Sequence, residues 1–199
     1  MAQQVTTSST LVGALWPADK TSALLRNIIL AFVGAGLLTL AAKVQVPFWP
    51  VPMTMQTFAV LVIGMAYGWR LGAVTVLVYL AEGAAGLPVF VGTPEKGIGV
   101  AYMMGSTGGY LLGFVLMAAV VGWLAERGWH RNVLTTGAAM LIGEVVMYIP
   151  GLLWLGALFG WDKPILQWGL TPFILGDLTK LALAAVLLPL AWRLIRRFR

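Results

Sequence analysis

The chain has 199 residues, of which 60% are hydrophobic and 10% are charged, and its net charge at neutral pH is +6. Soluble domains carry about 45–50% apolar and about 25% charged residues, so this composition excludes a soluble enzyme, a disordered chain and a free nucleic-acid-binding protein. The absence of cysteine and the single histidine exclude disulfides, thiolate metal sites and multi-histidine metal sites. The composition therefore predicts a membrane protein.

Residues 1–20 are interpreted as an N-terminal tail with an interfacial turn at Leu15–Trp16, because no positively charged segment or cleavage site of a signal peptide precedes the first apolar run. A spanning helix needs about 20 apolar residues, and six apolar segments follow the tail. The predicted spans lie at about 21–42, 54–68, 71–90, 108–126, 133–159 and 173–195. These segments are continuously apolar and longer than the alternating strands of about 10 residues in a membrane barrel. We therefore expect an all-α polytopic membrane protein whose residues 21–199 form one bundle of six transmembrane helices.

The basic residues predict how this bundle is oriented. With six spans both termini lie on the same side, and most basic residues fall on that side: Lys20, Arg26, Arg70, Arg127, Arg131, Arg193, Arg196, Arg197 and Arg199. Only Lys43, Lys96 and Lys163 fall on the other side. By the positive-inside rule, this asymmetry predicts cytoplasmic termini. The net positive charge is thus a topology signal and a source of attraction to anionic membrane lipid, and not a nucleic-acid footprint.

Four ionisable residues lie inside predicted spans, where each costs about 2.5–3.5 kcal/mol and so needs a reason. They are Glu82, Glu144, Asp177 and Lys180. Asp177 and Lys180 are three residues apart on one helix face, at depths of about 8 Å and about 12 Å from the outer end of the last span. The two charges either neutralise each other and lock two helices together, or bind a ligand. Glu82 and Glu144 are either protonated structural groups or functional ones.

Other polar and aromatic residues cluster in the outer half of the predicted bundle. Gln56 opens the second span, Phe90 ends the third, and Tyr148 lies one turn beyond Glu144 in the fifth. The fourth span opens at Ser106-Thr107-Gly108-Gly109-Tyr110, where unpaired N–H groups at a helix start favour an anion. Together these positions predict a pocket that opens to the external face. The candidate ligand-binding residues are Asp177, Lys180, Glu144, Tyr148, Gln56, Phe90 and Tyr110.

No motif for hydrolytic chemistry occurs in the sequence. The Walker A pattern is absent, because GTPEKGIG lacks its spacing, so we expect no ATP hydrolysis by this chain. HExxH, GxSxG and SxxK are also absent, which argues against a membrane hydrolase. The sequence predicts a protein that is not an enzyme and needs no cofactor or metal.

Four strings, in this order and spacing, resemble the BioY family: VPFWPVPMTMQTFAVLVIGMAYG, YLAEGAAGLPVFVG, MGSTGGYLLGF and FILGDLTK. Proteins of this family are biotin-specific substrate-binding (S) components of energy-coupling-factor (ECF) transporters. The resemblance covers about residues 25–192 and implies high-affinity capture of biotin outside a bacterial inner membrane. It also implies that Asp177 and Lys180, in the G-D-x-x-K element, contact the ligand. Further implications are separate ATPase subunits and a transmembrane coupling (T) subunit, which the small residues Ala31 and Ala35 on the first helix would meet.

The chemistry of biotin is compatible with these residues. Asp177 and Lys180 offer an acceptor and a donor to the ureido ring, and Phe90, Tyr148 or Trp154 offer walls to the thiophane ring and tail. The carboxylate needs a cation or a helix start, which Lys180, Lys96 or the GSTGGY corner would supply. An alternative is a stand-alone secondary carrier or facilitator for a small organic acid or vitamin, with Glu82 and Glu144 relaying protons. An inverted repeat would favour that alternative, and none is visible in the sequence.

Overall fold

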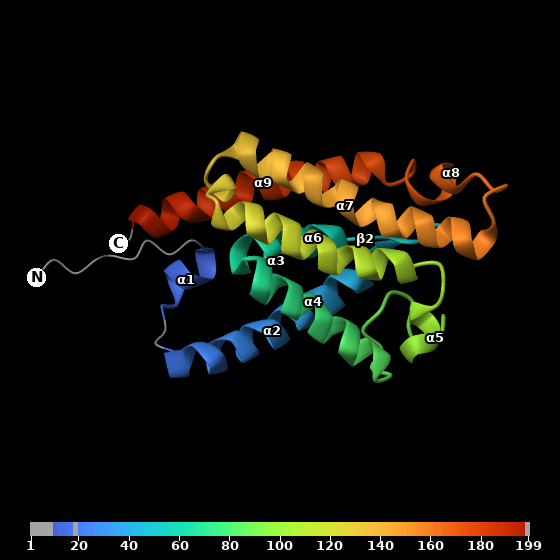
Figure 1. The fold of residues 1–199 in the computed structure, drawn as a ribbon, viewed down its shortest axis with the longest axis horizontal. Coiled ribbons are helices and arrows are strands. Elements are labelled where there is room, and N and C mark those ends of the chain that lie inside the picture. Colours follow the sequence, from blue (N-terminus) through green and yellow to red (C-terminus); the bar gives the residue numbers. More distant parts are fainter. Residues whose placement is uncertain (1–9, 18–19, 198–199) are drawn as a thin grey trace, which may run out of the picture.

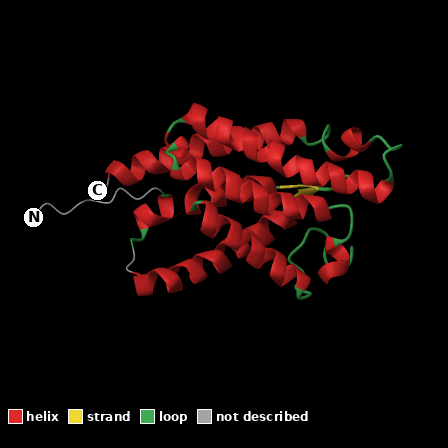
Figure 2. Ribbon diagram, in the orientation of Figure 1, coloured by secondary structure: helices red, strands yellow, loops and turns green. Residues whose placement is uncertain are grey.

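The computed structural model describes residues 10–17 and 20–197, which form a bundle of helices that run back and forth along one axis (Figures 1 and 2). A two-stranded antiparallel hairpin, in which Gln45 pairs with Thr54 and Val46 with Met53, follows the first long helix. The elements in chain order are α1 (Leu11–Leu15), α2 (Lys20–Lys43), β1 (Gln45–Val46), β2 (Met53–Thr54), α3 (Gln56–Tyr67), α4 (Trp69–Ala84), α5 (Gly99–Met103), α6 (Gly108–Glu126), the 3₁₀ helix η1 (Trp129–Arg131), α7 (Val133–Phe159), α8 (Ile165–Gly169) and α9 (Ile174–Arg197).

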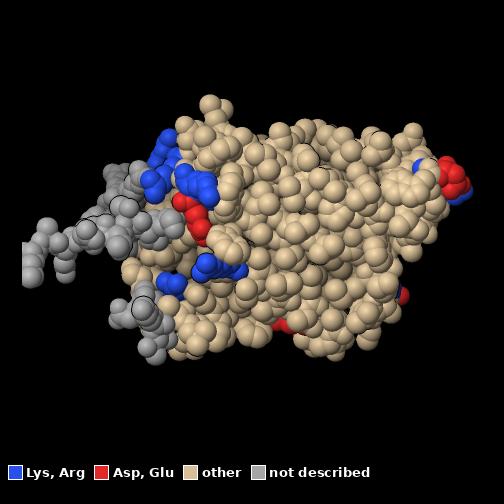
Figure 3. Space-filling view, in the orientation of Figure 1, with Lys and Arg blue, Asp and Glu red and all other residues tan. Residues whose placement is uncertain are grey.

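The prediction of a helical multi-pass membrane protein is confirmed, although fewer helices than expected reach spanning length. In the described part of the chain, four helices are long and apolar enough to cross a membrane: Ser22–Lys43, Gly108–Glu126, Val133–Phe159 and Ile174–Leu194. Helix α3 has 12 residues and α4 has 16, so they extend only about 18 Å and about 24 Å. The face of the bundle seen in Figure 3 is almost free of charge along its length, and basic side chains gather at the end that carries α1.

Helix α4 ends earlier than the sequence predicts. The expected span reaches residue 90, but the helix stops at Ala84. Gly86 has a φ of +94°, which side-chain-bearing residues rarely adopt. Pro88 follows; a proline has no N–H to donate and disfavours the helical conformation of the residue before it. Phe90 therefore lies in a loop that folds back against α4, and not at the end of a helix.

Helix α6 lies at the centre of the bundle and packs against α3, α4 and α7. Its closest neighbour is α7, and small residues bring the two backbones together. At Gly109, a Cβ atom would lie 2.3 Å from the carbonyl oxygen of Pro150 and 2.3 Å from the Cβ of Trp154. Such close approach of small residues is how membrane helices gain van der Waals contact when lipid and protein are equally apolar.

The predicted N-terminal tail contains a short helix that is tied to the bundle. In α1, Thr10 caps the first turn by accepting a hydrogen bond from the Gly13 N–H at 3.2 Å. Leu11 and Ala14 are buried where α1 packs against α3 and α9, whereas Leu15 and Trp16 are exposed. Residues 1–9, 18 and 19 of the predicted tail lie outside the described residues.

Candidate functional site

A pocket lies inside the bundle, in the half away from α1, and side chains from six helices line it. The first two turns of α3, α6 and α9 meet there with the second half of α7, one tyrosine each from α4 and α5, and two loops. The empty space between the lining side chains, mouth included, is about 540 Å³. Most of the lining is apolar or aromatic, and the polar groups form two separate clusters.

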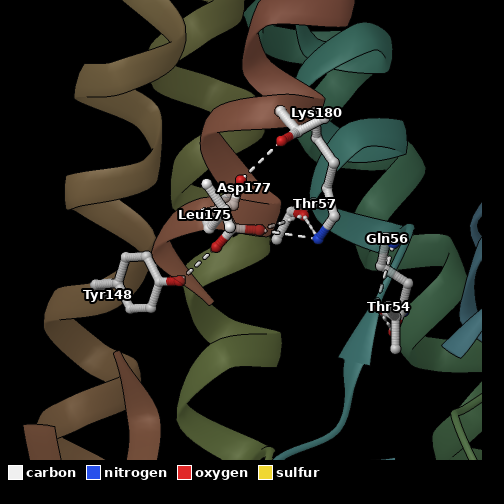
Figure 4. Close-up of polar contacts among 8 residues, drawn as sticks. Thr54, Gln56, Thr57, Tyr148, Leu175, Asp177 and Lys180 are labelled. Carbon is white, nitrogen blue, oxygen red and sulfur yellow. Dashed lines mark hydrogen bonds and ion pairs between the residues drawn. The ribbon is translucent and has the colours of Figure 1, made fainter. Parts of the chain in front are cut away.

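The first polar cluster joins Asp177 and Lys180 of α9 to Thr57 of α3 and Tyr148 of α7 (Figure 4). Lys180 Nζ donates to Asp177 Oδ1 at 2.9 Å and to Thr57 Oγ1 at 3.0 Å, and Thr57 Oγ1 donates to Asp177 Oδ1 at 3.2 Å. Tyr148 Oη donates to the other carboxylate oxygen, Asp177 Oδ2. Asp177 and Lys180 are only 6% and 8% exposed, so the pair lies in a medium where an isolated charge would be costly.

The backbone favours this arrangement. Asp177 lies in the first turn of α9, where the positive end of the helix dipole stabilises a carboxylate. Lys180 follows one turn later and faces the same side. An ammonium group has three N–H donors, and the hydrogen bonds of Lys180 to Asp177 and Thr57 use two of them. One donor therefore remains for a ligand.

The second polar cluster centres on Gln56. Its Nε2 donates to Tyr79 Oη at 2.8 Å, and Tyr79 Oη in turn donates to the Val89 carbonyl oxygen at 3.2 Å. Thr54 Oγ1 donates to Gln56 Oε1 at 3.3 Å and also accepts the Gln56 backbone N–H at 3.1 Å. The amide group of Gln56 is thus held in one orientation at the base of α3.

Aromatic rings form two walls between these clusters. Phe90 stacks on Tyr102, with centroids 4.8 Å apart and planes inclined by 14°, and meets the edge of Tyr79 at 5.4 Å. Opposite them, Tyr110 and Tyr148 pack edge to face at 6.1 Å, and Tyr110 Oη donates to the Gly169 carbonyl oxygen at 2.7 Å. Burial raises the pKa of Tyr102 above its usual value of about 10, so its hydroxyl stays protonated and can donate.

Lys43 holds the loop that carries Phe90. From the end of α2, its Nζ donates to the carbonyl oxygens of Pro88 at 2.8 Å and Phe90 at 2.9 Å. It also contacts Thr93 Oγ1 at 3.3 Å. A single ammonium group therefore hydrogen-bonds two backbone carbonyl oxygens of the loop that follows α4, and these bonds hold Phe90 against the pocket.

The structure brings together six of the seven candidate ligand-binding residues. Asp177, Lys180, Tyr148, Gln56, Phe90 and Tyr110 all line the pocket. Glu144 does not: it lines a neighbouring crevice between α7 and α9, which shares Tyr148 and Asp177 with the pocket. Glu144 is 5% exposed, and its carboxylate oxygens have no hydrogen-bond partner among the residues described. The reason is that Glu144 lies one turn before Tyr148, and only the later turn of α7 reaches the pocket. Glu82 is partly exposed on α4 and also lies outside the pocket.

Several lining residues were missed by sequence reasoning. Thr57 directly follows the candidate Gln56, and a hydroxyl group at the start of an apolar helix is only a weak indication of a binding residue. Tyr79, Tyr102 and Phe173 sit among apolar residues with no distinctive spacing, and nothing local marks them. Trp154, which the sequence suggests as a wall, instead donates from Nε1 to the Gly105 carbonyl oxygen at 2.8 Å and covers the start of α6.

Ala31 and Ala35, which are predicted to face a partner subunit, are enclosed within this chain, and Ala31 also lines a groove between α1, α2 and α4. The two residues are 4% and 0% exposed. Helix α2 packs against α3 and α4. At the neighbouring Gly34, an added Cβ atom would lie 2.4 Å from Cγ2 of Thr75 on α4, so the two helices are in close contact there. Small residues on a membrane helix favour close packing, and here that packing occurs within the chain.

The arrangement suits an uncharged or singly charged organic molecule with a polar head and an apolar body. Aromatic walls would cover the body, and the Asp177–Lys180 pair would offer both an acceptor and a donor to the head. Within the described ranges, no group of three or more His, Asp or Glu side chains is placed to hold a metal ion.

Comparison with known proteins gives concordant results. A sequence model described as the BioY family matches residues 8–197. The chain is 33% identical over 162 residues to the "Probable biotin transporter BioY" of Pyrococcus horikoshii, covering 81% of this chain and 93% of that protein. It is 35% identical over 167 residues to the "Biotin transporter BioY" of Thermotoga maritima, covering 82% and 94%. A crystal structure at 2.1 Å of the S-component for biotin from an ECF-type ABC transporter has the same fold, with a TM-score of 0.74 and 22% identity over 88% of this chain and 95% of that one.

Proposed function

The chain belongs to the BioY family of transporter components, not of enzymes, and we propose that it binds biotin and delivers it into the cell as the S component of an ECF transporter. The observation that carries this proposal is the pocket itself. Its buried Asp177–Lys180 pair lies in the G-D-x-x-K element that resembles the family's ligand-binding motif, and two aromatic walls extend from it.

We propose that the ureido ring of biotin meets the Asp177–Lys180 end of the pocket. The ring carries two N–H donors, which a carboxylate accepts, and a carbonyl oxygen, which the remaining Lys180 N–H would bind. The carboxylate of biotin would be repelled by Asp177, so it belongs at the opposite end. The thiophane ring and the aliphatic tail would lie between Phe90 and Tyr110, where burial of apolar surface contributes about 25 cal/mol per Å².

The topology of transport is part of the same proposal. Six helical segments, α2, α3, α4, α6, α7 and α9, cross the membrane as one domain over residues 21–199, with α3 and α4 as the short members. Both termini are cytoplasmic, since the basic residues gather at the α1 end (Figure 3), and the pocket then opens outward. The chain carries no nucleotide-binding motif, so a separate T subunit and ATPase subunits in the bacterial inner membrane would supply the energy.

Isothermal titration calorimetry of the purified chain tests this function. Biotin is expected to bind with a stoichiometry of one, whereas riboflavin and thiamine, as control vitamins, are expected to give no heat. Absence of biotin binding would overturn the proposal. Uptake into proteoliposomes without ATPase subunits would instead favour a stand-alone carrier.

Lys43 is expected to be a positioning residue for the ligand pocket. Lys43→Met removes the donor that Pro88 and Phe90 share, so the loop loses the order that prepares Phe90 for binding. We expect biotin affinity to fall about 10-fold, mainly through faster dissociation in stopped-flow fluorescence. Lys163→Met, which removes an exposed lysine paired with Asp162, is the control. Unchanged dissociation in Lys43→Met would contradict this role.

Ala35→Trp is expected to destabilise the fold and not to block a partner selectively. The enclosed Ala35 has no room for an indole between α2 and its neighbours, and overpacking of this kind costs about 1–3 kcal/mol or more. We expect a lower thermal unfolding temperature in detergent. Leu37→Trp, at an exposed position of the same helix, should leave the temperature unchanged. A stable Ala35→Trp variant that binds biotin but loses coupling would instead support the partner-interface prediction.

A further inference from the structure

A second cavity of the molecule has no part in the proposed biotin pocket. It is a groove between α1, α2 and α4, with about 970 Å³ of empty space including its mouth, at the end of the bundle where the basic residues gather. Helices α2 and α4 cross near their middles and diverge towards this end (Figure 1). The walls are apolar: Leu24, Ile28 and Phe32 come from α2, and Leu71, Val74 and Val78 come from α4.

Two arginines line the same groove, and neither forms an ion pair with a carboxylate among the residues described. Arg26 donates to the Trp16 carbonyl oxygen at 2.6 Å and to Asn27 Oδ1 at 3.0 Å, both uncharged acceptors. The guanidinium of Arg70 lies 5.0 Å from the centroid of the Trp69 ring. One carboxylate, that of Glu126, also lines the groove, and its Oε1 accepts the Trp69 backbone N–H at 3.2 Å. The groove therefore carries two positive charges and one negative charge.

We propose that this groove binds one anionic phospholipid of the adjoining leaflet. Its phosphate would lie between Arg26 and Arg70, and one acyl chain would follow the apolar walls. The net charge of +1 balances a single phosphodiester, whereas a zwitterionic lipid would bring a cation of its own. Basic pockets between membrane helices bind anionic headgroups in this way, and the planar guanidinium group matches phosphate geometry.

The shape of the groove agrees with a lipid chain. From Leu24 to Phe32 the α2 wall extends about 12 Å, and three of its side chains, Leu24, Ile28 and Phe32, are exposed. An apolar helix of another protein would cover these side chains equally well, but it would leave the two arginines without a counter-charge. A bound anionic lipid satisfies both the walls and the arginines.

Native mass spectrometry of the delipidated full chain tests the proposal. With palmitoyl-oleoyl phosphatidylglycerol, we expect one retained lipid per protein and about a 10-fold preference over the matching phosphatidylcholine, in line with the attraction of two arginines for an anionic headgroup. The double variant Arg26→Gln/Arg70→Gln should lose the preference and keep biotin binding. The control Arg127→Gln/Arg193→Gln removes two charges from the same end but outside the groove, and it should retain the preference.

Glycerophosphoglycerol and inorganic phosphate distinguish a lipid from a free anion. Neither is expected to compete with phosphatidylglycerol, since neither reaches the apolar walls; competition at similar concentrations would overturn the proposal. An undiminished preference in Arg26→Gln/Arg70→Gln would also overturn it.

Should that double variant fail to fold, a phosphatidylglycerol with a diazirine in one acyl chain tests the wild-type protein. Crosslinks are expected in residues 24–32 and 71–78. Crosslinks spread evenly over the bundle would show that lipid does not occupy the groove.

Discussion

Asp177→Asn is expected to weaken biotin binding by about 100- to 1,000-fold, which corresponds to about 3–4 kcal/mol. The carboxylate holds Lys180, Thr57 and Tyr148 in one hydrogen-bonded network. Its negatively charged oxygens would also accept hydrogen bonds from the ureido N–H groups. Charge-assisted hydrogen bonds contribute about 1.5–3 kcal/mol each. The amide is nearly the same size, but it leaves the Lys180 ammonium without a counter-charge in a buried site.

Calorimetry with Asp177→Asn, Lys180→Met and the double variant measures this effect as a thermodynamic cycle. The sum of the two single losses should exceed the loss of the double variant, because both residues act through one ion pair and either substitution removes it. Asp162→Asn, which removes an exposed aspartate that is paired with Lys163, is the matched control and should bind like the wild type. If the pair only locks helices together, Asp177→Asn will lower the unfolding temperature and leave the biotin affinity of the folded protein unchanged, which would refute the site.

Gly109→Leu is expected to prevent recovery of folded protein. Even a Cβ atom at this position would lie 2.3 Å from the Pro150 carbonyl oxygen, and a backbone atom cannot move aside as a side-chain end can. A leucine would therefore separate α6 from α7, the closest helix pair of the bundle. The separation would also part Tyr110 from Tyr148, the aromatic pair that walls the pocket.

The smaller change Gly109→Ala should reduce the free energy of unfolding by about 3 kcal/mol, at the upper end of what overpacking costs. Gly36→Ala is the control, since a Cβ atom there meets nothing within 4 Å. Thermal unfolding in detergent, followed by size-exclusion chromatography, measures both variants. Equal unfolding temperatures for Gly109→Ala and Gly36→Ala would contradict the close α6–α7 contact.

Much of the fold follows from local properties of the sequence. Helices α6 and α7 begin and end at the predicted residues, 108–126 and 133–159. Apolar length and the surrounding glycines and prolines act within a few residues, and such signals survive any tertiary arrangement. The pairing of Asp177 with Lys180 is predictable for the same reason, because three residues of helix bring two side chains to one face.

The remaining features depend on contacts between distant segments. Thr57 joins the Asp177 network from another helix, and Lys43 orders the loop of Phe90 from the end of α2. Burial of Ala31 and Ala35, and the separation of Glu144 from the pocket, likewise arise only when α2 meets α4 and α7 meets α9.

The physical reason is the solvent. A helix in water shows its buried face by an apolar stripe, but lipid is as apolar as the protein interior, so the two faces of a membrane helix look alike in sequence. The sequence by itself determined the class of protein, most of the helix limits and six of the residues that line the pocket. The tertiary structure alone decided which faces meet, and with them the shape of the pocket and the groove between α2 and α4.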